Sequence, residues 1–527
     1  MHFIKSLKSL PWHIFAFPAA LVIHEIESVK SQLATEQAMP AFLAVESVAI
    51  ALFLLAFIAT RKIKIAGLIT TAVMMISLSY LGVAFAVSRL VPNAPPIASL
   101  ALMALILAGA VGGVLKKTWL FGGKTYATDY DALQNLFNLM TCFMLIINLV
   151  PLVSFNISLN QKAQKWQRHY GKIVEEVIPK KSLVERPDIY YIILDAFAHQ
   201  KTLTELGGYD NKAFIDYLKS KGFILPQRAA SNYDRTHLSI TSSLNLDYLN
   251  PISDEAIARG GTIEQDYPDV LYERLMADNA LFAIYKKLGY KIVSVADMPC
   301  PNADKNYLDE YGVVFTTAFA KLTPLWGLEP YTHILRDAFC SARLSMEKHL
   351  SEILTMNGPK LVFIHSNLSH PPSVFDAKGQ RKELPANLLN DDLHDFAAYV
   401  EQVKYTEKQA VKAIDQIIAA YPADKQPVII LQADHGPYKE MDDKHAYFNE
   451  VMRILNAYRI PMSINKKSIE SMRVDLAEMT PVNSFRYISN ECIGLQNPLP
   501  LLPNQAWCSP ERSNPVGWRI VNEQLEF

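Results

Sequence analysis

The sequence predicts a membrane protein of two parts: a transmembrane domain of five helices, followed by an α/β domain with a mostly parallel central sheet. Two observations predict it. Long apolar runs dominate the chain up to about residue 155, and apolar runs of strand length alternate with helical segments after Pro187. The mean hydropathy of +0.08, high for a chain that is 20% charged, averages over these two different parts.

Five apolar runs come close to the length of about 20 residues at which a helix crosses the core of a bilayer. They lie at residues 10–26, 40–60, 65–87, 97–115 and 134–155. The first run is short and contains Glu25, so a signal peptide or an interfacial helix is the alternative for it. No convincing small-residue cleavage site follows this run, which favours an uncleaved anchor.

Basic residues in the short loops predict the orientation, because Lys and Arg are retained on the cytoplasmic side. The loops predicted to lie inside contain eight of them: Lys5, Lys8, Arg61, Lys62, Lys64, Lys116, Lys117 and Lys124. The alternate loops contain only Lys30 and Arg89. We therefore expect residues 1–155 to form a multi-pass domain with its N-terminus inside, and the rest of the chain to lie outside.

The outer part begins with residues 156–187, whose pattern fits either an amphipathic helix along the headgroups or a solvated linker. Residues 188–527 form the predicted soluble domain. The chain has 51 Lys+Arg against 52 Asp+Glu and a formal net charge of −1. It therefore lacks the basic surplus typical of nucleic-acid-binding proteins.

Cysteine usage agrees with an outside location, where disulfides persist. Cys142 lies in the fifth apolar run and is expected to be a free thiol, whereas four cysteines lie in the soluble domain: Cys300, Cys340, Cys492 and Cys508. None has a metal-ligand spacing. Two disulfides are predicted, with the pairing of the two closest cysteines favoured; four unpaired thiols are the alternative.

The soluble domain alternates strands with helices, which argues for a mostly parallel sheet. Strands are expected at residues 189–194, 291–295, 360–365 and 427–432. Helices are expected at residues 211–221, 281–288, 331–356 and 393–420.

Polar residues next to three strand ends mark the sheet edge where a site is expected. Asp195 directly follows the first strand, and the pair Asp434-His435 follows the last one. His365 ends the third strand and is followed by His370. A carboxylate and a carboxylate–imidazole pair can converge on one divalent cation. The alternative is that the lone aspartate only caps a helix.

A polar segment from Ser231 to Asn245 contains the candidate nucleophile. It runs into a predicted helix that opens at Thr236. A hydroxyl at a helix N-terminus meets the helix dipole and free backbone N–H groups, an environment that suits phosphate. The alternative is that Thr236 only caps the helix.

The order of these motifs resembles the alkaline phosphatase/sulfatase superfamily. The resemblance is carried by Asp195, Thr236, His365-Ser-Asn-Leu-Ser-His370-Pro-Pro and Asp434-His435-Gly436. Five spans followed by an outside domain are similar to its lipoteichoic acid synthase and phosphoethanolamine transferase branches. Residues 232–245, 370–376 and 455–458 look like bacterial membrane proteins called sulfatase-like hydrolase/transferases. The resemblance covers nearly the whole chain and implies an alkaline-phosphatase-like fold for residues 188–527 and the bacterial cytoplasmic membrane as the location.

The resemblance also implies a site for a divalent metal ion, Zn²⁺ or Mn²⁺, with four ligands: Asp195, Thr236, Asp434 and His435. Thr236 would be both ligand and nucleophile. His365 and His370 match a stretch that in relatives contacts the substrate phosphate or a second metal ion, and His370 is the stronger candidate for catalysis. Lipoteichoic acid synthases usually carry Glu where this chain has Asp195, which weakens the case for glycerophosphate.

The function implied is that of an envelope transferase. It would move a headgroup of phosphoethanolamine or phosphoglycerol type from a phospholipid to a glycan or lipid acceptor through a phospho-threonine. One alternative is a phosphodiesterase or phosphatase, in which water completes the reaction; another is a non-catalytic binding module. Sulfate-ester hydrolysis is not expected, because Cys300-Pro-Asn-Ala-Asp lacks the Cys/Ser-x-Pro-x-Arg context of sulfatases. The oligomeric state stays open.

Overall fold

The computed structural model describes residues 10–92, 94–120, 127–177, 186–258, 268–384, 395–437, 444–465, 467–508 and 519–527. Its contacts divide the chain into two compact units. Unit 1 comprises Met1–Ser158 and Gly312–Phe339, and unit 2 comprises Leu159–Tyr311 and Cys340–Phe527. Residues 312–339 are therefore an insertion in the sequence of unit 2 that packs with unit 1, which no sequence pattern indicated.

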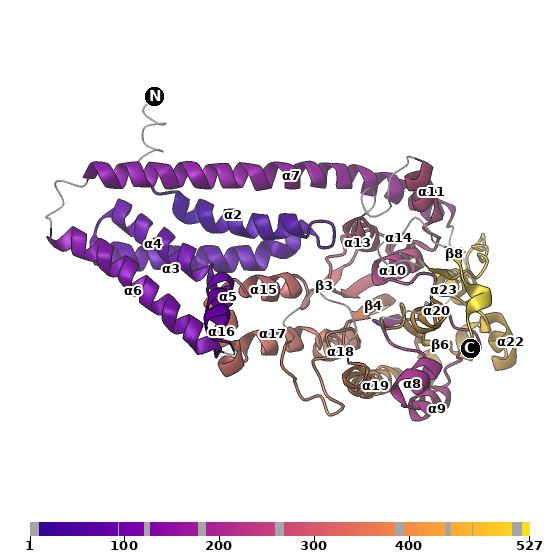
Figure 1. The fold of residues 1–527 in the computed structure, drawn as a ribbon. Coiled ribbons are helices and arrows are strands. Elements are labelled where there is room, and N and C mark those ends of the chain that lie inside the picture. The colour runs from indigo at the N-terminus through magenta and orange to yellow at the C-terminus, as the bar shows by residue number, and fades with distance from the viewer. Residues whose placement is uncertain are drawn as a thin grey trace. The chain divides into compact units, whose positions relative to one another are not determined.

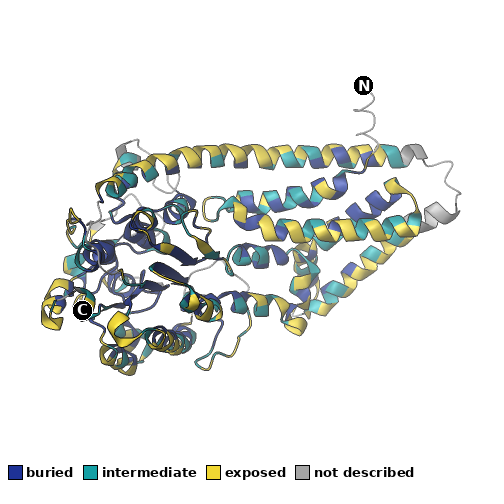
Figure 2. Cartoon of the chain, turned by 180° about the vertical axis from the view of Figure 1, so that it is seen from behind, coloured by how far each residue is buried: buried dark blue, intermediate teal, exposed yellow. Residues whose placement is uncertain are grey.

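The described residues in the first part of unit 1 form helices joined by short non-helical connections (Figure 1). Its elements are α2 (His13–Ser28), η1 (Thr35–Ala38), α3 (Met39–Thr60), α4 (Ile63–Ser77), α5 (Tyr80–Leu90), α6 (Pro96–Leu120) and the start of α7 (Ala127–Glu176). Their outward-facing side chains are largely apolar, and Figure 2 shows long exposed stretches along α3, α6 and α7. Apolar exposure of this kind fits contact with lipid.

The third predicted span is two helices, not one. Helices α4 and α5 meet at an angle of 51°, so the pair is either one broken span or a re-entrant loop. The hydroxyl of Ser79 donates a hydrogen bond to the carbonyl of Met75 (2.7 Å) at this bend. Bonding of a serine to the carbonyl four residues earlier is a known cause of helix bending.

Fewer helices are long enough to span a membrane than the five apolar runs predict. In the described ranges, three helical stretches are long and apolar enough to cross a membrane, and four if the bent pair is one span. Helix α2 has only 16 residues, fewer than the usual minimum of about 17. Five spans therefore stay a prediction.

Helix α7 continues without interruption through most of the predicted linker. Residues 156–176 are helical, because this stretch is rich in Gln, Lys and Glu, which favour helix. Its aromatic residues Trp166 and Tyr170 are buried against protein, and the Tyr170 hydroxyl lies 3.4 Å from the carbonyl oxygen of Tyr248. The aromatic residues of this part of α7 are thus packed in unit 2. Residues 178–185 lie outside the described residues.

Unit 2 is built on a six-stranded sheet in the order β3-β2-β4-β1-β5-β6. The strands are β1 (Ile189–Leu194), β2 (Lys291–Val295), β3 (Lys305–Tyr307), β4 (Lys360–Ser366), β5 (Val428–Ala433) and β6 (Asn456–Arg459). All pairings are parallel except that of β5 with β6. The mostly parallel sheet and its four predicted strands are confirmed. A separate two-stranded ladder pairs β7 (Trp507–Cys508) with β8 (Arg519–Ile520).

The three central strands are buried along their whole length, as continuous apolar runs in a parallel sheet predict. Helices of unit 2 include α8 (Gln200–Gly207), α9 (Lys212–Ser220), α10 (Thr236–Asn245), α11 (Asn250–Ala258), α13 (Asp269–Ala277), α14 (Ala280–Lys287), α18 (Ser345–Thr355), α19 (Phe396–Ala419), α20 (Lys444–Met452), α21 (Met462–Asn465), α22 (Ile469–Leu476) and α23 (Pro481–Ile488). Two short 3₁₀ helices, η2 (Ala423–Lys425) and η5 (Asn522–Gln524), and the π-helical segment η3 (Ser489–Ile493) belong to the same unit. Residues of β1, β4, β5 and α19 belong to one large core cluster of buried apolar side chains.

The long helix predicted at residues 331–356 is three helices instead. They are α16 (Pro324–Thr332), α17 (Ile334–Ala342) and α18. His333 ends α16 with a φ of +54°, which interrupts the helical hydrogen bonding. The chain passes from unit 1 back to unit 2 within this stretch. Its apolar side chains are therefore divided between two different units.

The predicted disulfides are wrong. All five cysteines are free thiols, and the four of the soluble part are buried: Cys300, Cys340, Cys492 and Cys508. Each has its own apolar or polar surroundings; the Cys508 thiol, for example, donates to a carboxylate oxygen of Asp234 (3.3 Å). Burial as small apolar side chains accounts for them without any pairing.

Candidate functional site

Strand register places two carboxylates side by side. Leu194 at the end of β1 pairs with Ser366 of β4 and with Ala433 of β5. The next residues along β1 and β5 are Asp195 and Asp434, which therefore leave the sheet at the same level. Parallel strands bring their carboxyl ends to one edge, where sites of α/β sheets form.

The turn after β1 is held in a strained conformation. Ala196 has a φ of +54°, a left-handed conformation that costs a residue with a Cβ about 1–3 kcal/mol. Three hydrogen bonds maintain it: the Ala196 N–H donates to Asp434 Oδ1 (3.0 Å), the Tyr399 hydroxyl to the Ala196 carbonyl (2.7 Å) and the Ser369 hydroxyl to the Asp195 carbonyl (2.7 Å). The position of Asp195 is thus fixed by its neighbours.

Thr236 is the first residue of α10 and does not cap that helix. The N-cap position belongs to Arg235, and no side chain caps the helix. The Thr236 hydroxyl instead lies 2.8 Å from His435 Nε2 and 3.5 Å from Asp195 Oδ1. A hydroxyl at the start of a helix is therefore aimed at the carboxylates and imidazole that follow β1 and β5.

The orientation of His435 is set by its own backbone. Its Nδ1 lies 2.6 Å from the carbonyl oxygen of Gly436, and because a carbonyl only accepts, Nδ1 carries a proton and Nε2 presents its lone pair to the site. Gly436 donates its N–H to the Val451 carbonyl (2.7 Å). A Cβ at this position would collide with the Glu450 carbonyl, so only glycine fits.

Asp195, Asp434 and His435 fit a divalent metal ion. Each offers one ligand atom, the three atoms lie within 4.8 Å of one another, and all three residues are buried. Asp434 Oδ2 is buried and has no hydrogen-bond donor among the described residues. An unsatisfied buried carboxylate oxygen is costly unless a cation or a proton compensates it. Two carboxylates with one imidazole suit Zn²⁺ and Mn²⁺ alike.

The electrostatics of the two carboxylates differ. Burial and the charge of Asp195 raise the pKa of Asp434. Burial alone would also raise the pKa of Asp195, but the positive charge of His370, together with the hydrogen bond and the charge of His365, holds it well below its usual range. Two acids whose pKa values are pushed apart are typical of functional sites.

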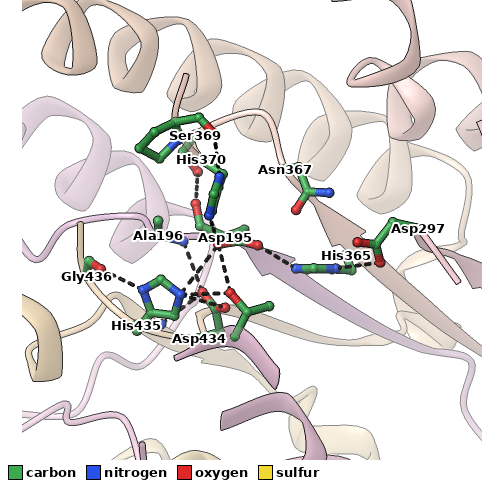
Figure 3. A network of polar contacts seen from close by, with 12 residues as sticks. Asp195, Ala196, Asp297, His365, Asn367, Ser369, His370, Asp434, His435 and Gly436 are labelled. Atoms are coloured by element: carbon green, nitrogen blue, oxygen red, sulfur yellow. Dashed lines mark hydrogen bonds and ion pairs between the residues drawn. The ribbon is translucent and has the colours of Figure 1, made fainter. Parts of the chain in front are cut away.

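His365 lies between two carboxylates (Figure 3). Its Nε2 is 2.9 Å from Asp195 Oδ2, and its Nδ1 is 3.4 Å from Asp297 Oδ1. Burial alone would lower the pKa of His365, but hydrogen bonds to both aspartates raise it well above its ordinary value. His365 is therefore a buried imidazolium that donates on both sides, which leaves it no lone pair for a metal ion.

His370 lies at the edge of the same cluster (Figure 3). Its Nδ1 is 2.5 Å from the Pro371 carbonyl oxygen, and its Nε2 is 4.0 Å from Asp195 Oδ1. Its backbone carbonyl accepts from the Arg343 guanidinium and from the Gln402 amide (3.1 Å). These hydrogen bonds fix the loop after β4, and the partly exposed His370 ring can contact an entering molecule.

All six residues singled out from the sequence come together: Asp195, Thr236, His365, His370, Asp434 and His435. The sequence reasoning missed Asp297, although it follows the predicted strand β2 by two residues and the strand-end rule would have found it. It also missed Glu310, which accepts from Asn367 Nδ2 (2.9 Å). Burial raises the pKa of Glu310 to about 7. No sequence signal marks this residue, because a loop acid is usually solvated.

No protein-family model matches the chain, and no curated protein sequence is similar to it. Solved structures do match. The C-terminal periplasmic domain of EptC from Escherichia coli, in complex with Zn, is 12% identical over 67% of this chain and 97% of that chain, with a TM-score of 0.43. Lipooligosaccharide phosphoethanolamine transferase A from Neisseria meningitidis is 13% identical over 76% of this chain and 70% of that chain, with a TM-score of 0.40. The lipoteichoic acid synthase LtaP from Listeria monocytogenes is 13% identical over 56% of this chain and 71% of that chain, with a TM-score of 0.33.

These matching structures are members of the alkaline phosphatase/sulfatase superfamily, which the motifs of this chain resemble. The similarity is one of distant architecture, so the chemistry of this protein rests on its own side chains.

Proposed function

We propose that this protein is a metal-dependent phosphotransferase of the bacterial cytoplasmic membrane. It takes a phosphorylated headgroup, of phosphoethanolamine or phosphoglycerol type, from a phospholipid donor and passes it to a glycan or lipid acceptor outside the membrane. The observation that carries the proposal is the Thr236 hydroxyl, which lies at the start of a helix 2.8 Å from His435 Nε2 and faces two buried carboxylates. The helical unit 1 suits a donor that is itself a membrane lipid.

Asp195, Asp434 and His435 would hold the metal ion, with the Thr236 oxygen completing the set. When bound there, a divalent cation lowers the pKa of the threonine hydroxyl and neutralises charge on the phosphoryl oxygens. His435 keeps its Nε2 lone pair in the site because its Nδ1 proton is held by the Gly436 carbonyl.

In the first half of the reaction, the Thr236 hydroxyl gives its proton to water and its oxygen forms a bond to phosphorus. The bond from phosphorus to the glycerol oxygen of the lipid breaks, and this oxygen takes a proton from His370. In the second half, an acceptor hydroxyl gives its proton to His370 and attacks phosphorus. The Thr236 oxygen leaves and regains a proton from water. His365, charged and fixed between Asp195 and Asp297, orients the Asp195 carboxylate.

The test is mass spectrometry of the full-length protein in vesicles after exposure to labelled phosphatidylethanolamine or phosphatidylglycerol. Wild type should carry the labelled headgroup on Thr236. Thr236→Ala should carry none and should not turn over, whereas Thr236→Ser should keep partial activity because a hydroxyl remains. Thr241→Ala is the matched control, since Thr241 lies on the same helix and its hydroxyl donates to the Tyr272 carbonyl (3.1 Å).

Turnover of Thr236→Ala at the wild-type rate would refute the mechanism. Continuous headgroup release by wild type without any acceptor alcohol would show instead a hydrolase that uses the same phospho-threonine. His370→Ala should slow turnover by about 100-fold, the size of a lost general acid–base contribution, and should leave the metal content unchanged.

A further inference from the structure

The insertion of residues 312–339 is an integral part of unit 1. Its first helix, α15 (Val313–Ala320), buries Phe315 and Phe319 in a cluster with residues of α2, η1, α3 and α7: Val22, Ile26, Ala38, Ala41 and Leu152. The two phenylalanine rings stack at 6.2 Å. Helix α16 packs on α6. The inserted segment is therefore fixed to the helices that are apolar enough to cross a membrane.

Close backbone approaches define where the insertion packs. A Cβ at Gly312 would lie 2.6 Å from the Gln37 carbonyl oxygen, and one at Gly327 would lie 2.5 Å from the Tyr80 hydroxyl. The Tyr80 N–H also donates to the Leu322 carbonyl (3.1 Å). Gln37 lies in the connection between the first two apolar runs, and Tyr80 begins α5, which leads to the next connection poor in basic residues. The positive-inside rule places both connections outside.

The second half of the insertion exposes apolar side chains. Leu325 is 49% exposed, Leu328 37%, Tyr331 56% and Ile334 58%. These four follow one another at intervals of three residues. In the described part of unit 2, by contrast, exposed large apolar side chains are scattered singly along the chain: Leu308, Met462, Ile469, Val474, Leu501 and Ile520. Spacings of three residues place the first three on one side of α16.

We propose that residues 325–334 insert into the boundary between headgroups and acyl chains of the phospholipid bilayer, on the outer side of the membrane. Helix α16 packs on α6, which is only 11% buried along its most apolar window. Lys321 lies 5.2 Å from the ring of Trp326, and a lysine with a tryptophan is an anchor typical of membrane interfaces. The occupant of this surface is thus lipid.

Residues next to both ends of the insertion form hydrogen bonds with the loop after β4, which carries His370. Glu310, which accepts from Asn367, lies two residues before the insertion. Arg343, which donates to the carbonyls of His370 and Pro371, lies four residues after it. Anchoring of residues 325–334 in the bilayer therefore acts on the loop that carries the candidate catalytic histidine, and this consequence rests on the proposed function.

The lipid contact is tested with an environment-sensitive fluorophore on single cysteines in full-length protein in phosphatidylcholine nanodiscs. The background is Cys142→Ser, because the other four native cysteines are buried. Leu328→Cys is the test site and Leu325→Cys the second variant if the first does not fold. Leu55→Cys on α3, 64% exposed, is the membrane control, and Val474→Cys on α22, 72% exposed, is the soluble control.

Lipids with a shallow spin label should quench about half of the emission at Leu328, more than lipids with a deep label do. At Leu55 the deep label should quench more, and at Val474 neither should act. Quenching at Leu328 by iodide from water would overturn the proposal, because the surface would then be solvated. Protection of Leu328 from both iodide and spin-labelled lipid would also overturn it, because protein would then cover the surface.

The effect of the bilayer contact on the candidate site is tested separately, by the rate of Thr236 adduct formation. The double variant Leu325→Ser and Leu328→Ser should form the Thr236 adduct from vesicle lipid about tenfold more slowly than wild type, whereas Val474→Ser should not differ from wild type. An unchanged adduct rate in the double variant would overturn this link. If wild type forms no adduct at all, the proposed function fails, but the quenching result still decides the lipid contact.

Discussion

Replacement of Asp297 by Asn tests whether a carboxylate outside the metal set controls the candidate site. Asp297 Oδ1 lies 3.4 Å from His365 Nδ1. Asn keeps the shape and an acceptor oxygen but removes the charge. Two unit charges at this distance attract by about 5 kcal/mol at an effective dielectric constant of about 20. Because the Asp297 side chain is 39% exposed, screening by water reduces this to about 1–3 kcal/mol.

A loss of this size lowers the rate by about 10- to 100-fold and lowers the pKa of His365, which its two carboxylates otherwise raise. The lower pKa makes the deficit depend on pH. Below both pKa values the imidazolium is present in wild type and in Asp297→Asn, so the two rates converge. As the pH rises, His365 loses its proton at a lower pH in the variant than in wild type. The rate deficit of the variant therefore grows with pH.

The assay is the initial rate of diacylglycerol release from phospholipid vesicles with an acceptor present, measured across the pH range. Asp304→Asn is the matched control, because Asp304 is 44% exposed and lies in the same loop, where it accepts from the Ile292 N–H (2.8 Å) and not from His365. Metal content, measured by elemental analysis, should be equal in all three proteins. Superimposable pH profiles of wild type and Asp297→Asn, or an equal loss in Asp304→Asn, would refute the reasoning.

Four further predictions use other parts of the chain. Asp434→Asn should lose the bound metal on dialysis, as measured by elemental analysis, because it removes a buried carboxylate with an unsatisfied oxygen; retention of one equivalent would contradict the metal site. Lys360→Met should lower the apparent melting temperature by several degrees, because it breaks a buried ion pair with Asp188 (2.9 Å) whose loss costs about 3–5 kcal/mol; Lys212→Met, at an exposed pair, should not. Glu347, whose pKa burial raises to about 7, stabilises the fold at low pH and loses this contribution as the pH rises through that value; Glu347→Gln should therefore lose less stability between about pH 5 and pH 8 than wild type does, which melting curves at both pH values would show. A C-terminal alkaline phosphatase fusion should be active in whole cells, since the basic residues predict an outside C-terminus; an inactive but fully expressed fusion would contradict this orientation.

Much of unit 2 and of the site could be read from the sequence, because both depend on local patterns. A strand buried on both faces must be a continuous apolar run, and β1, β4 and β5 are such runs. In parallel sheets the residues after the strand ends share one edge, so Asp195, Asp434 and His435 could be grouped without knowledge of the strand order. The same rule applied to β2 would have added Asp297.

The cysteines and the insertion could not be read in this way. Four cysteines in a domain expected outside suggested two bridges, yet distance along the chain does not fix distance in space, and packing placed each thiol in separate surroundings. The apolar periodicity at residues 331–356 showed that side chains would be buried but not in which core. The boundary between unit 1 and unit 2 falls within α17, and α18 lies in unit 2. Only the folded chain defines this division.

The sequence by itself determined the apolar helices, the strands, their polarity and the set of reactive side chains, because each of these depends on residue type and short spacing. The tertiary structure alone decided how those side chains act on one another. The 2.8 Å approach of Thr236 to His435, the charged state of His365 between two carboxylates and the return of residues 312–339 to unit 1 join segments far apart in the chain. Such contacts follow from the packing of the whole core, which no local pattern encodes.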